Sequence, residues 1–188
     1  MTNKESPAEV STLANGLRVV TETMPHLETA SVGVWVDSGA RYETAELNGI
    51  SHMLEHMAFK GTTTRTARGI AEEIEAVGGY LNAYTSREHT TYYAFPDQAM
   101  GRPILGPPAN VSSFDGTVIR DYMEAHYHAP NMIVSAAGNV DHAEVVGMVE
   151  DMFGELENND TLGHDDARYA GGDRRENREL EQVHLVVG

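Results

Sequence analysis

The chain has 188 residues, enough for one domain with its own hydrophobic core but not for two domains of ordinary size. Its formal charge of −16 would repel the phosphates of nucleic acids and anionic membranes, so we expect neither as a partner and expect basic peptides to be attracted instead. The chain contains no cysteine, which excludes disulfides and thiolate metal sites, so that any metal must be held by nitrogen and oxygen.

The amino terminus and the apolar segments bear on where the protein resides. Residues 1–7 lack the apolar core of a signal peptide, and no stretch of the sequence approaches the length of a membrane span. We therefore expect a cytoplasmic protein.

Two strands are predicted near the amino terminus. Residues 17–24 have a strand-like composition, and the valines of residues 32–36 alternate with other side chains, which is typical of a β-strand. Residues 25–28 contain a proline and suit a turn between them. The pattern predicts that the two strands form a hairpin.

The next helix carries a motif of the form H-x-x-E-H, at His52, Glu55 and His56. Residues 48–51 before it suit a helix start, and residues 61–63 after it suit a helix end. At about 100° per residue the two histidines share one helix face and can reach one metal ion, while Glu55 flanks them as a general base. The motif predicts a zinc-dependent hydrolytic centre; the alternative is a pair of core histidines on an apolar helix face.

A second helix is predicted over residues 66–77, with a buried stripe made by Ile70, Ile74 and Val77 and an end at residues 78–79, which are both glycine.

A third strand is predicted over residues 80–85, resuming at residues 90–94, because both runs are rich in β-branched and aromatic side chains. Residues 95–110 are dense in proline and glycine, which predicts an irregular surface loop.

The last part of the core is predicted to alternate helix, strand and helix. A helix is expected over residues 114–127 and a strand over residues 131–137. Asp141 then caps a helix that ends at Gly154. The side chains expected to face inward from that helix are Val145, Val149 and Met152.

The order of elements predicts an α+β fold, with a mixed, largely antiparallel sheet and helices packed on one face. Residues 1–154 would form the domain, and residues 155–178 are acidic and nearly free of large apolar side chains, as in a linker. Residues 179–188 contain a final strand at 183–187 that would open a following domain absent from the chain.

Several runs of residues together resemble the pitrilysin or insulinase-type (inverzincin) zinc peptidases, most closely the branch with mitochondrial processing peptidase and its bacterial relatives. The runs that carry the resemblance are residues 48–62, 78–88, 101–106 and 129–132, with the two predicted strands before them. On this resemblance, residues 1–154 are a shortened N-terminal metallopeptidase-like domain with a reduced processing-peptidase-like fold.

The resemblance implies roles for the matching positions. His52 and His56 would bind zinc, and Glu55 would take the proton from the water that attacks the peptide carbonyl. Residues Asn82, Ala83 and Tyr84 match the family's edge strand, which binds an extended substrate by strand addition. An ordinary sheet strand is the alternative interpretation of these three residues.

The resemblance breaks at the third zinc ligand. In the family this ligand is a Glu on a later helix, about 75 residues beyond the second His. That spacing here falls within the strand predicted at residues 131–137, and the chain joins Ala94 to Phe95 where the family has further residues that include the ligand helix. No third ligand can therefore be assigned. Other carboxylates and histidines are better explained as solvated or capping groups, namely Glu73, Glu75, Glu124, His126 and His128.

Two functions remain open, with an internally deleted relic as a third alternative. The first is a zinc metalloendopeptidase that hydrolyses peptide or protein substrates through zinc-activated water. The second is a non-catalytic peptide-binding or partner subunit that lacks the third ligand. Because family members usually pair this half with a homologous half, and because losing helices uncovers an apolar sheet face, we expect a homo-oligomer or a complementary peptidase-like subunit.

Overall fold

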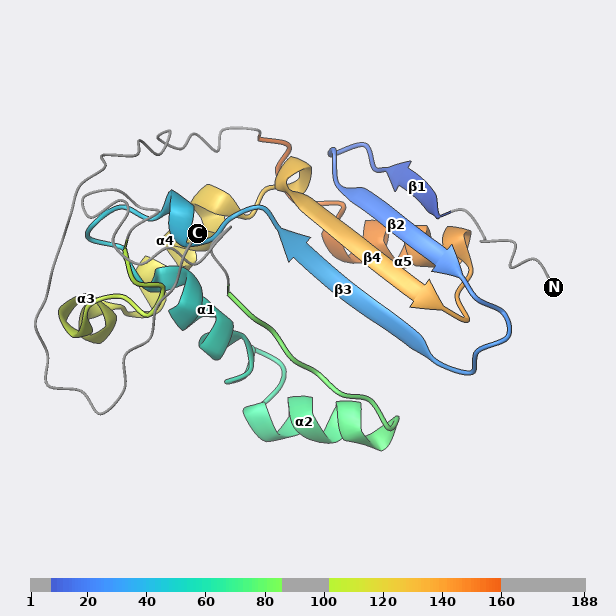
Figure 1. The fold of residues 1–188 in the computed structure, drawn as a ribbon, viewed down its shortest axis with the longest axis horizontal. Coiled ribbons are helices and arrows are strands. Elements are labelled where there is room, and N and C mark those ends of the chain that lie inside the picture. The colour runs from blue at the N-terminus through green and yellow to red at the C-terminus, as the bar shows by residue number, and fades with distance from the viewer. Residues whose placement is uncertain (1–7, 86–101, 160–188) are drawn as a thin grey trace, which may run out of the picture.

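The computed structural model describes residues 8–85 and 102–159 (Figure 1). It has an α+β architecture in which one mixed sheet and a group of helices share the chain, as predicted. Among the described residues, no helix is both long and apolar enough to cross a membrane.

The sheet has four strands in the order β1-β2-β4-β3. Their bounds are Glu9–Thr12 for β1, Arg18–Thr23 for β2, Ala30–Val36 for β3 and Met132–Gly138 for β4. The central strand β4 runs parallel to β2 and antiparallel to β3, while β1 is antiparallel to β2. The sheet is therefore mixed and largely antiparallel.

The predicted hairpin between residues 17–24 and 32–36 is wrong, because β4 separates β2 from β3. The connection 24–29 has enough residues to cross the two strand spacings, which together are about 10 Å. Strand β4 carries no charged side chain and alternates buried and half-buried residues, which suits an interior strand. Residue order alone does not reveal this long-range insertion.

The main hydrophobic core lies between the sheet and helix α5, His142–Phe153. The predicted N-cap is confirmed, since a side-chain oxygen of Asp141 accepts a hydrogen bond from the backbone N–H of Glu144. Val145 and Val149 are buried as predicted, but Met152 is 66% exposed and does not belong to the core. The buried residues of this core are Leu17, Val19, Ala129, Met132, Val134, Ala136, Val145 and Val149.

A second, smaller core joins helix α1, Ile50–Ala58, to helix α4, Gly116–His126. Ile50, Leu54 and Tyr122 are its buried members. The predicted helix over 114–127 is thereby confirmed, with Asp115 as its N-cap. Part of the loop predicted over 95–110 instead enters a short helix, α3, Pro108–Ser113, whose first helical position is a proline.

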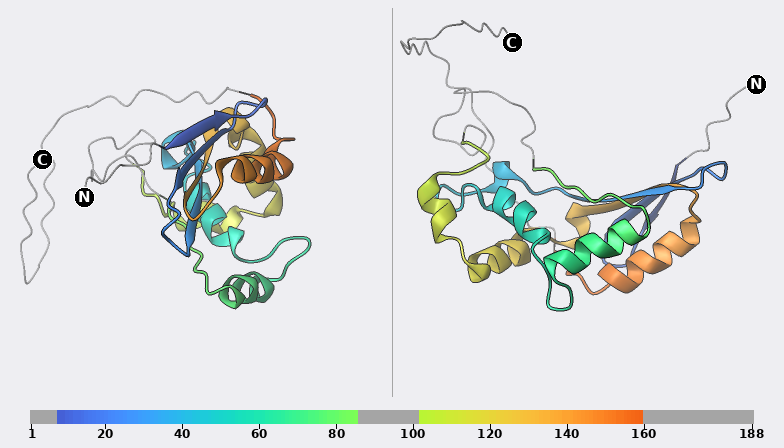
Figure 2. Two further views of the ribbon diagram at one scale, coloured as in Figure 1. Left: turned by 90° about the vertical axis from the view of Figure 1, so that its right-hand side faces the viewer. Right: turned by 90° about the horizontal axis from the view of Figure 1, so that it is seen from below.

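Helix α2, Ala67–Ala76, has the predicted position and is capped by Thr66, but its predicted burial is wrong. None of its residues, all of which are described, is buried, and Val77 at its end is 79% exposed. Figures 1 and 2 show α2 beside the free edge of β3, while α5 lies against the sheet. Among the described residues, no strand packs on this stripe; Ile70 and Ile74 instead line a hollow together with Tyr80 and Leu81.

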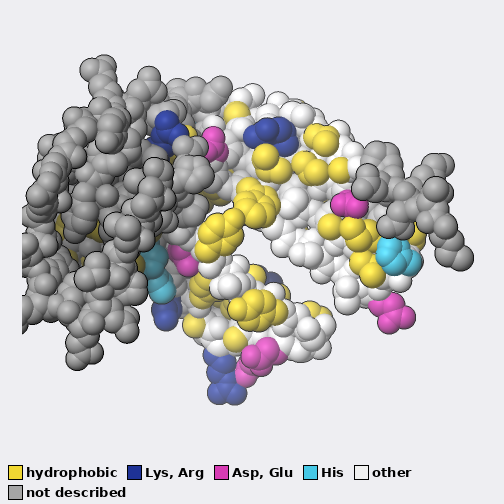
Figure 3. All heavy atoms as spheres, viewed as in Figure 1, with side chains coloured by type: hydrophobic (Ala, Val, Ile, Leu, Met, Phe, Trp, Pro, Cys, Tyr) yellow, Lys and Arg dark blue, Asp and Glu magenta, His cyan; other side chains and the backbone are white. Residues whose placement is uncertain are grey.

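The predicted third strand is confirmed in neither of its two parts. Residues 80–85, all described, are not part of any strand, so the prediction is wrong for them. Residues 90–94 and 183–187, and most of the predicted linker 155–178, lie outside the described residues. In Figure 3 an open gap separates α2 from the sheet, with hydrophobic side chains along its border.

Candidate metal centre

The two histidines of the motif lie on one face of α1, as the spacing predicted. Their Nε2 atoms are 3.2 Å apart, and their ring planes are nearly perpendicular at 85°. Two nitrogens that each lie about 2.0–2.1 Å from one tetrahedral zinc ion are about 3.3 Å apart. The rings of His52 and His56 share a hydrogen bond at this separation, and the same separation is compatible with two ligand positions of such an ion.

Glu55, on the same helix, is held by a residue that the sequence did not single out. Thr85 Oγ1 donates a 2.5 Å hydrogen bond to Glu55 Oε2. This contact attaches residues 80–85 to α1 and fixes the direction of the carboxylate beside the histidines. Thr85 and Glu55 are 30 residues apart, and a hydroxyl contact over that separation leaves no local pattern in the sequence.

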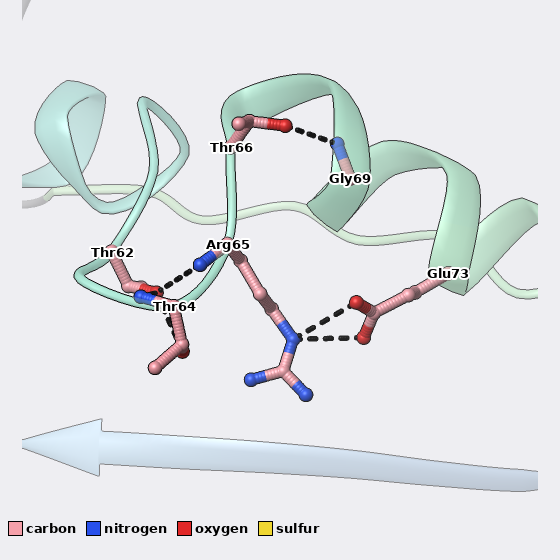
Figure 4. A network of polar contacts seen from close by, with 6 residues as sticks. All are labelled: Thr62, Thr64, Arg65, Thr66, Gly69 and Glu73. Atoms are coloured by element: carbon pink, nitrogen blue, oxygen red, sulfur yellow. Dashed lines mark hydrogen bonds and ion pairs between the residues drawn. The ribbon is translucent and has the colours of Figure 1, made fainter.

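The described residues do not supply a third protein ligand: no three His, Asp or Glu side chains among residues 8–85 and 102–159 are grouped to hold a metal ion. Figure 4 shows why Glu73 is not a substitute, because its two carboxylate oxygens accept hydrogen bonds from Arg65 Nε at 3.1 and 2.8 Å. His128 Nε2 donates to the Ala125 carbonyl at 3.0 Å, and His126 lies against the ring of Tyr122. Both histidines thus serve the packing of α4.

The first turn of α1 is held by Glu43, another residue that sequence analysis missed. Its side chain accepts hydrogen bonds from the backbone N–H groups of Gly49 and Ser51 and from Asn48 Nδ2, at 2.8, 3.0 and 2.9 Å. Gly49, the residue before the helix, has φ of 101°, a conformation that favours glycine. The cap therefore comes from the segment that precedes the helix, six to eight residues before the capped groups.

The opposite side of α1 is tied to α4 through hydroxyl groups. Tyr122 and Ser51 share a 2.9 Å hydrogen bond, and the Tyr122 hydroxyl also lies 3.1 Å from Ser38 Oγ. Burial is the main cause that raises the pKa of Tyr122, so this phenol stays neutral near pH 7. Burial also lowers the pKa of His126, an effect that the neighbouring His128 reinforces and Glu43 opposes.

A hollow of about 400 Å³ adjoins the histidine pair. It is largely apolar and is lined by Gly49, His52, Met53, His56, Met57, Lys60, Leu105 and Val111. Its wall forms because the chain near Gly106 packs tightly on the turn at Asn48, so closely that a β-carbon at Gly106 would collide with the Asn48 carbonyl. Leu105, in the predicted irregular loop, and Val111, just after it, had not been recognised from sequence.

The three residues predicted to bind substrate lie in the exposed segment 80–85, next to the sheet rather than in it. Asn82 and Ala83 are exposed, and the ring of Tyr84 meets that of Trp35 edge-on at 6.2 Å between centroids. Together with the Thr85 contact, this places the segment between α1 and the edge of β3. The role of Asn82, Ala83 and Tyr84 in binding a peptide stays a prediction.

Comparison with known families matches two models to this chain. The model described as insulinase (peptidase family M16) matches residues 18–99. The model described as the peptidase M16 inactive domain matches residues 113–188.

Among curated relatives, an uncharacterised zinc protease of Rickettsia felis is 35% identical, over 95% of this chain and 58% of its own length. A probable mitochondrial-processing peptidase subunit beta of Arabidopsis thaliana is 37% identical, over 88% of this chain and 43% of its own length. The chain thus spans about half the length of the curated relatives it matches. The Rickettsia alignment runs over 237 positions against 188 residues here, so at least 49 of its positions have no residue in this chain.

Solved structures agree with the fold. A protease from Helicobacter pylori superposes with a TM-score of 0.72 at 20% identity, over 87% of this chain and 54% of that one. The periplasmic protease PqqL of Escherichia coli superposes with a TM-score of 0.70 at 18% identity, over 90% of this chain and 26% of that one.

Proposed function

Since the chain belongs to the insulinase family of M16 peptidases, we propose that it is a zinc metalloendopeptidase-type protein in which His52 and His56 hold the metal and Glu55 is the general base. The observation that carries this proposal is the 3.2 Å separation of the two Nε2 atoms on the anchored helix α1. Zinc bound there would supply Lewis-acid activation of a water molecule and of the scissile carbonyl.

The protein's own groups would handle the proton. Glu55 accepts a proton from the attacking water and returns it to the leaving amine, the two tasks of a general base and acid in peptide hydrolysis. The hydrogen bond from Thr85 keeps the carboxylate from turning away between these steps. Such positioning would raise the rate of hydrolysis, because a proton passes between the water and the carboxylate only at hydrogen-bond distance.

We infer that the substrate is an extended peptide bound along residues 82–84. The segment is exposed and is joined through Thr85 to the helix that carries Glu55, so a peptide beside it would pass the histidines. Backbone hydrogen bonds would hold such a peptide with little dependence on its sequence. The net charge of −16 favours peptides that carry basic residues.

The deciding experiment is zinc stoichiometry and affinity by chelator competition, on the monodisperse wild-type protein and His56→Ala. We expect one zinc per chain and a large loss of affinity in the variant, since a single imidazole cannot chelate. If that holds, a peptide-cleavage assay with Glu55→Gln follows, and loss of cleavage with zinc still bound is the expected result. Zinc binding that is equal in His56→Ala and wild type would reject the metal centre.

One observation favours a second candidate, a non-catalytic peptide-binding or partner subunit. The described residues provide two nitrogen ligands and no third protein ligand, and a site of that kind binds zinc weakly. For this candidate we expect a basic, extended peptide to bind with the same affinity in wild type and Glu55→Gln, without cleavage in either. Cleavage by the wild-type protein that requires Glu55 would decide for the enzyme.

A further inference from the structure

The N-terminus of α1 cannot cap itself. The first four N–H groups of a helix lack partners within it, and the residue before α1 is Gly49, which has no side chain to accept them. One of these groups, the N–H of Ile50, donates to the Leu47 carbonyl at 3.0 Å. The N–H of Met53 donates to the Gly49 carbonyl at 3.0 Å, whereas the N–H groups of Gly49 and Ser51 need an acceptor outside the helix.

Glu43 is that acceptor, and it is built into the interior. The residue is only 3% exposed, and its two carboxylate oxygens accept hydrogen bonds from different donors. Oε2 accepts from the Gly49 N–H and from Asn48 Nδ2, while Oε1 accepts from the Ser51 N–H. A negative group at a helix N-terminus is also favoured by the helix dipole.

The metal-ligand pair depends on this turn. His52 is the third residue of α1 and lies in the turn that Glu43 caps, whereas His56 lies one turn later and is held by regular helical geometry. The 3.2 Å separation of their Nε2 atoms exists only while both turns are helical. Fraying of the first turn would move His52 and leave His56 in place.

We propose that Glu43 is a positioning residue for the histidine pair: its buried carboxylate sets the geometry of the chelate without touching the metal. The proposal rests on the metal-binding role of His52 and His56 described above. Neighbouring contacts hold Glu43 itself, because Arg102 Nη1 donates to its backbone carbonyl at 2.7 Å and Asn48 Nδ2 also bonds to the Pro103 carbonyl at 3.0 Å.

The experiment uses the copper(II) complex of nitrilotriacetate, which has open positions for two imidazoles one helical turn apart. Its affinity is measured for the full chain as wild type, His52→Ala and Glu43→Gln. The matched control is Asp115→Asn, the same carboxylate-to-amide change at the cap of α4, where Asp115 accepts from the N–H groups of Thr117 and Val118.

We expect Glu43→Gln to weaken chelate binding roughly tenfold or more, approaching His52→Ala, because a group supporting a ligand has effects of this size. Asp115→Asn should bind as wild type does. Binding by Glu43→Gln that equals wild type would overturn the proposal, as would an equal loss in Asp115→Asn.

A measurement on the wild type covers the case in which Glu43→Gln does not fold. The amide protons of Gly49 and Ser51 should exchange with solvent at least tenfold more slowly than those of Thr117 and Val118, whose cap is exposed. Equal exchange rates at the two helix ends would contradict the proposal that the Glu43 carboxylate holds the first turn of α1. If wild type binds the copper complex through both histidines but does not bind zinc, the proposed function fails while the positioning role stands.

Discussion

Helices α2 and α5 begin with the same local signal and end in opposite environments. Each has a capping side chain that accepts a hydrogen bond from the backbone three residues later, Thr66 in α2 and Asp141 in α5. The further polar contacts of α2 are local ion pairs, from Arg65 to Glu73 and from Arg68 to Glu72.

Helix α5 is instead held by distant parts of the chain. Ser11 and Thr21 contact the two ring nitrogens of His142 at 2.8 and 2.7 Å, and Asn15 Nδ2 donates to the Phe153 carbonyl at 2.8 Å. The comparison teaches that capping and periodicity are sufficient to form a helix, while burial of its apolar stripe requires a sheet surface to receive it.

The largest effect that the comparison predicts is in α5. Val149 is 2% exposed against the sheet, so Val149→Ala leaves a cavity there and should lower the free energy of unfolding by about 2 kcal/mol. Urea denaturation followed by circular dichroism measures this loss. A loss no greater than that of a surface substitution would contradict the core described for α5.

The contact between α1 and α4 should come next in size. Tyr122→Phe removes the hydroxyl that joins Ser51 and Ser38, and should lower the free energy of unfolding by about 1 to 2 kcal/mol. Tyr84→Phe, at an exposed ring, is the matched control and should have little effect. If both variants lose the same stability, the hydroxyl chain does not hold the two helices together.

A smaller effect is expected from pH. Burial lowers the pKa of His126 in the folded protein below its ordinary value of 6.5, so the unfolded chain binds a proton more readily. The free energy of unfolding should therefore fall as the pH drops below about 6.5, and the fall should cease below the lowered pKa. His126→Gln should have a shallower pH dependence than wild type in urea titrations between pH 7 and 5. An unchanged or steeper dependence in His126→Gln would exclude His126 as its source.

The smallest effect is expected at the end of α2. Val77→Ala removes the same two methyl groups as Val149→Ala, but from a side chain that is exposed, so the change in the free energy of unfolding should stay within about 0.5 kcal/mol. A loss close to that of Val149→Ala would mean that α2 is packed in solution, and would remove the difference between the two helices.

Much of the candidate site was predictable, because its central signal is local. The spacing of His52 and His56 places both on one face of any helix, and their Nε2 atoms indeed meet. Glu43 and Thr85 were not predictable, since each acts through contacts with residues that the sequence pattern does not connect to them. The strand predicted at 80–85 failed for a related reason: its composition suits a sheet, but it lacks pairing among the described strands.

By itself, the sequence determined helices α1, α2, α4 and α5, the Asp141 cap, the spacing of the histidine pair and the family, because these depend on residues a few positions apart or on the side chains themselves. The tertiary structure alone decided that β4 separates β2 from β3, that α2 remains exposed, and that Glu43 caps α1. Each of these depends on which groups meet outside the regular spacing of one helix or strand. Strand order and helix burial depend on which surfaces elsewhere in the fold can be buried together, and the local sequence pattern does not specify those surfaces.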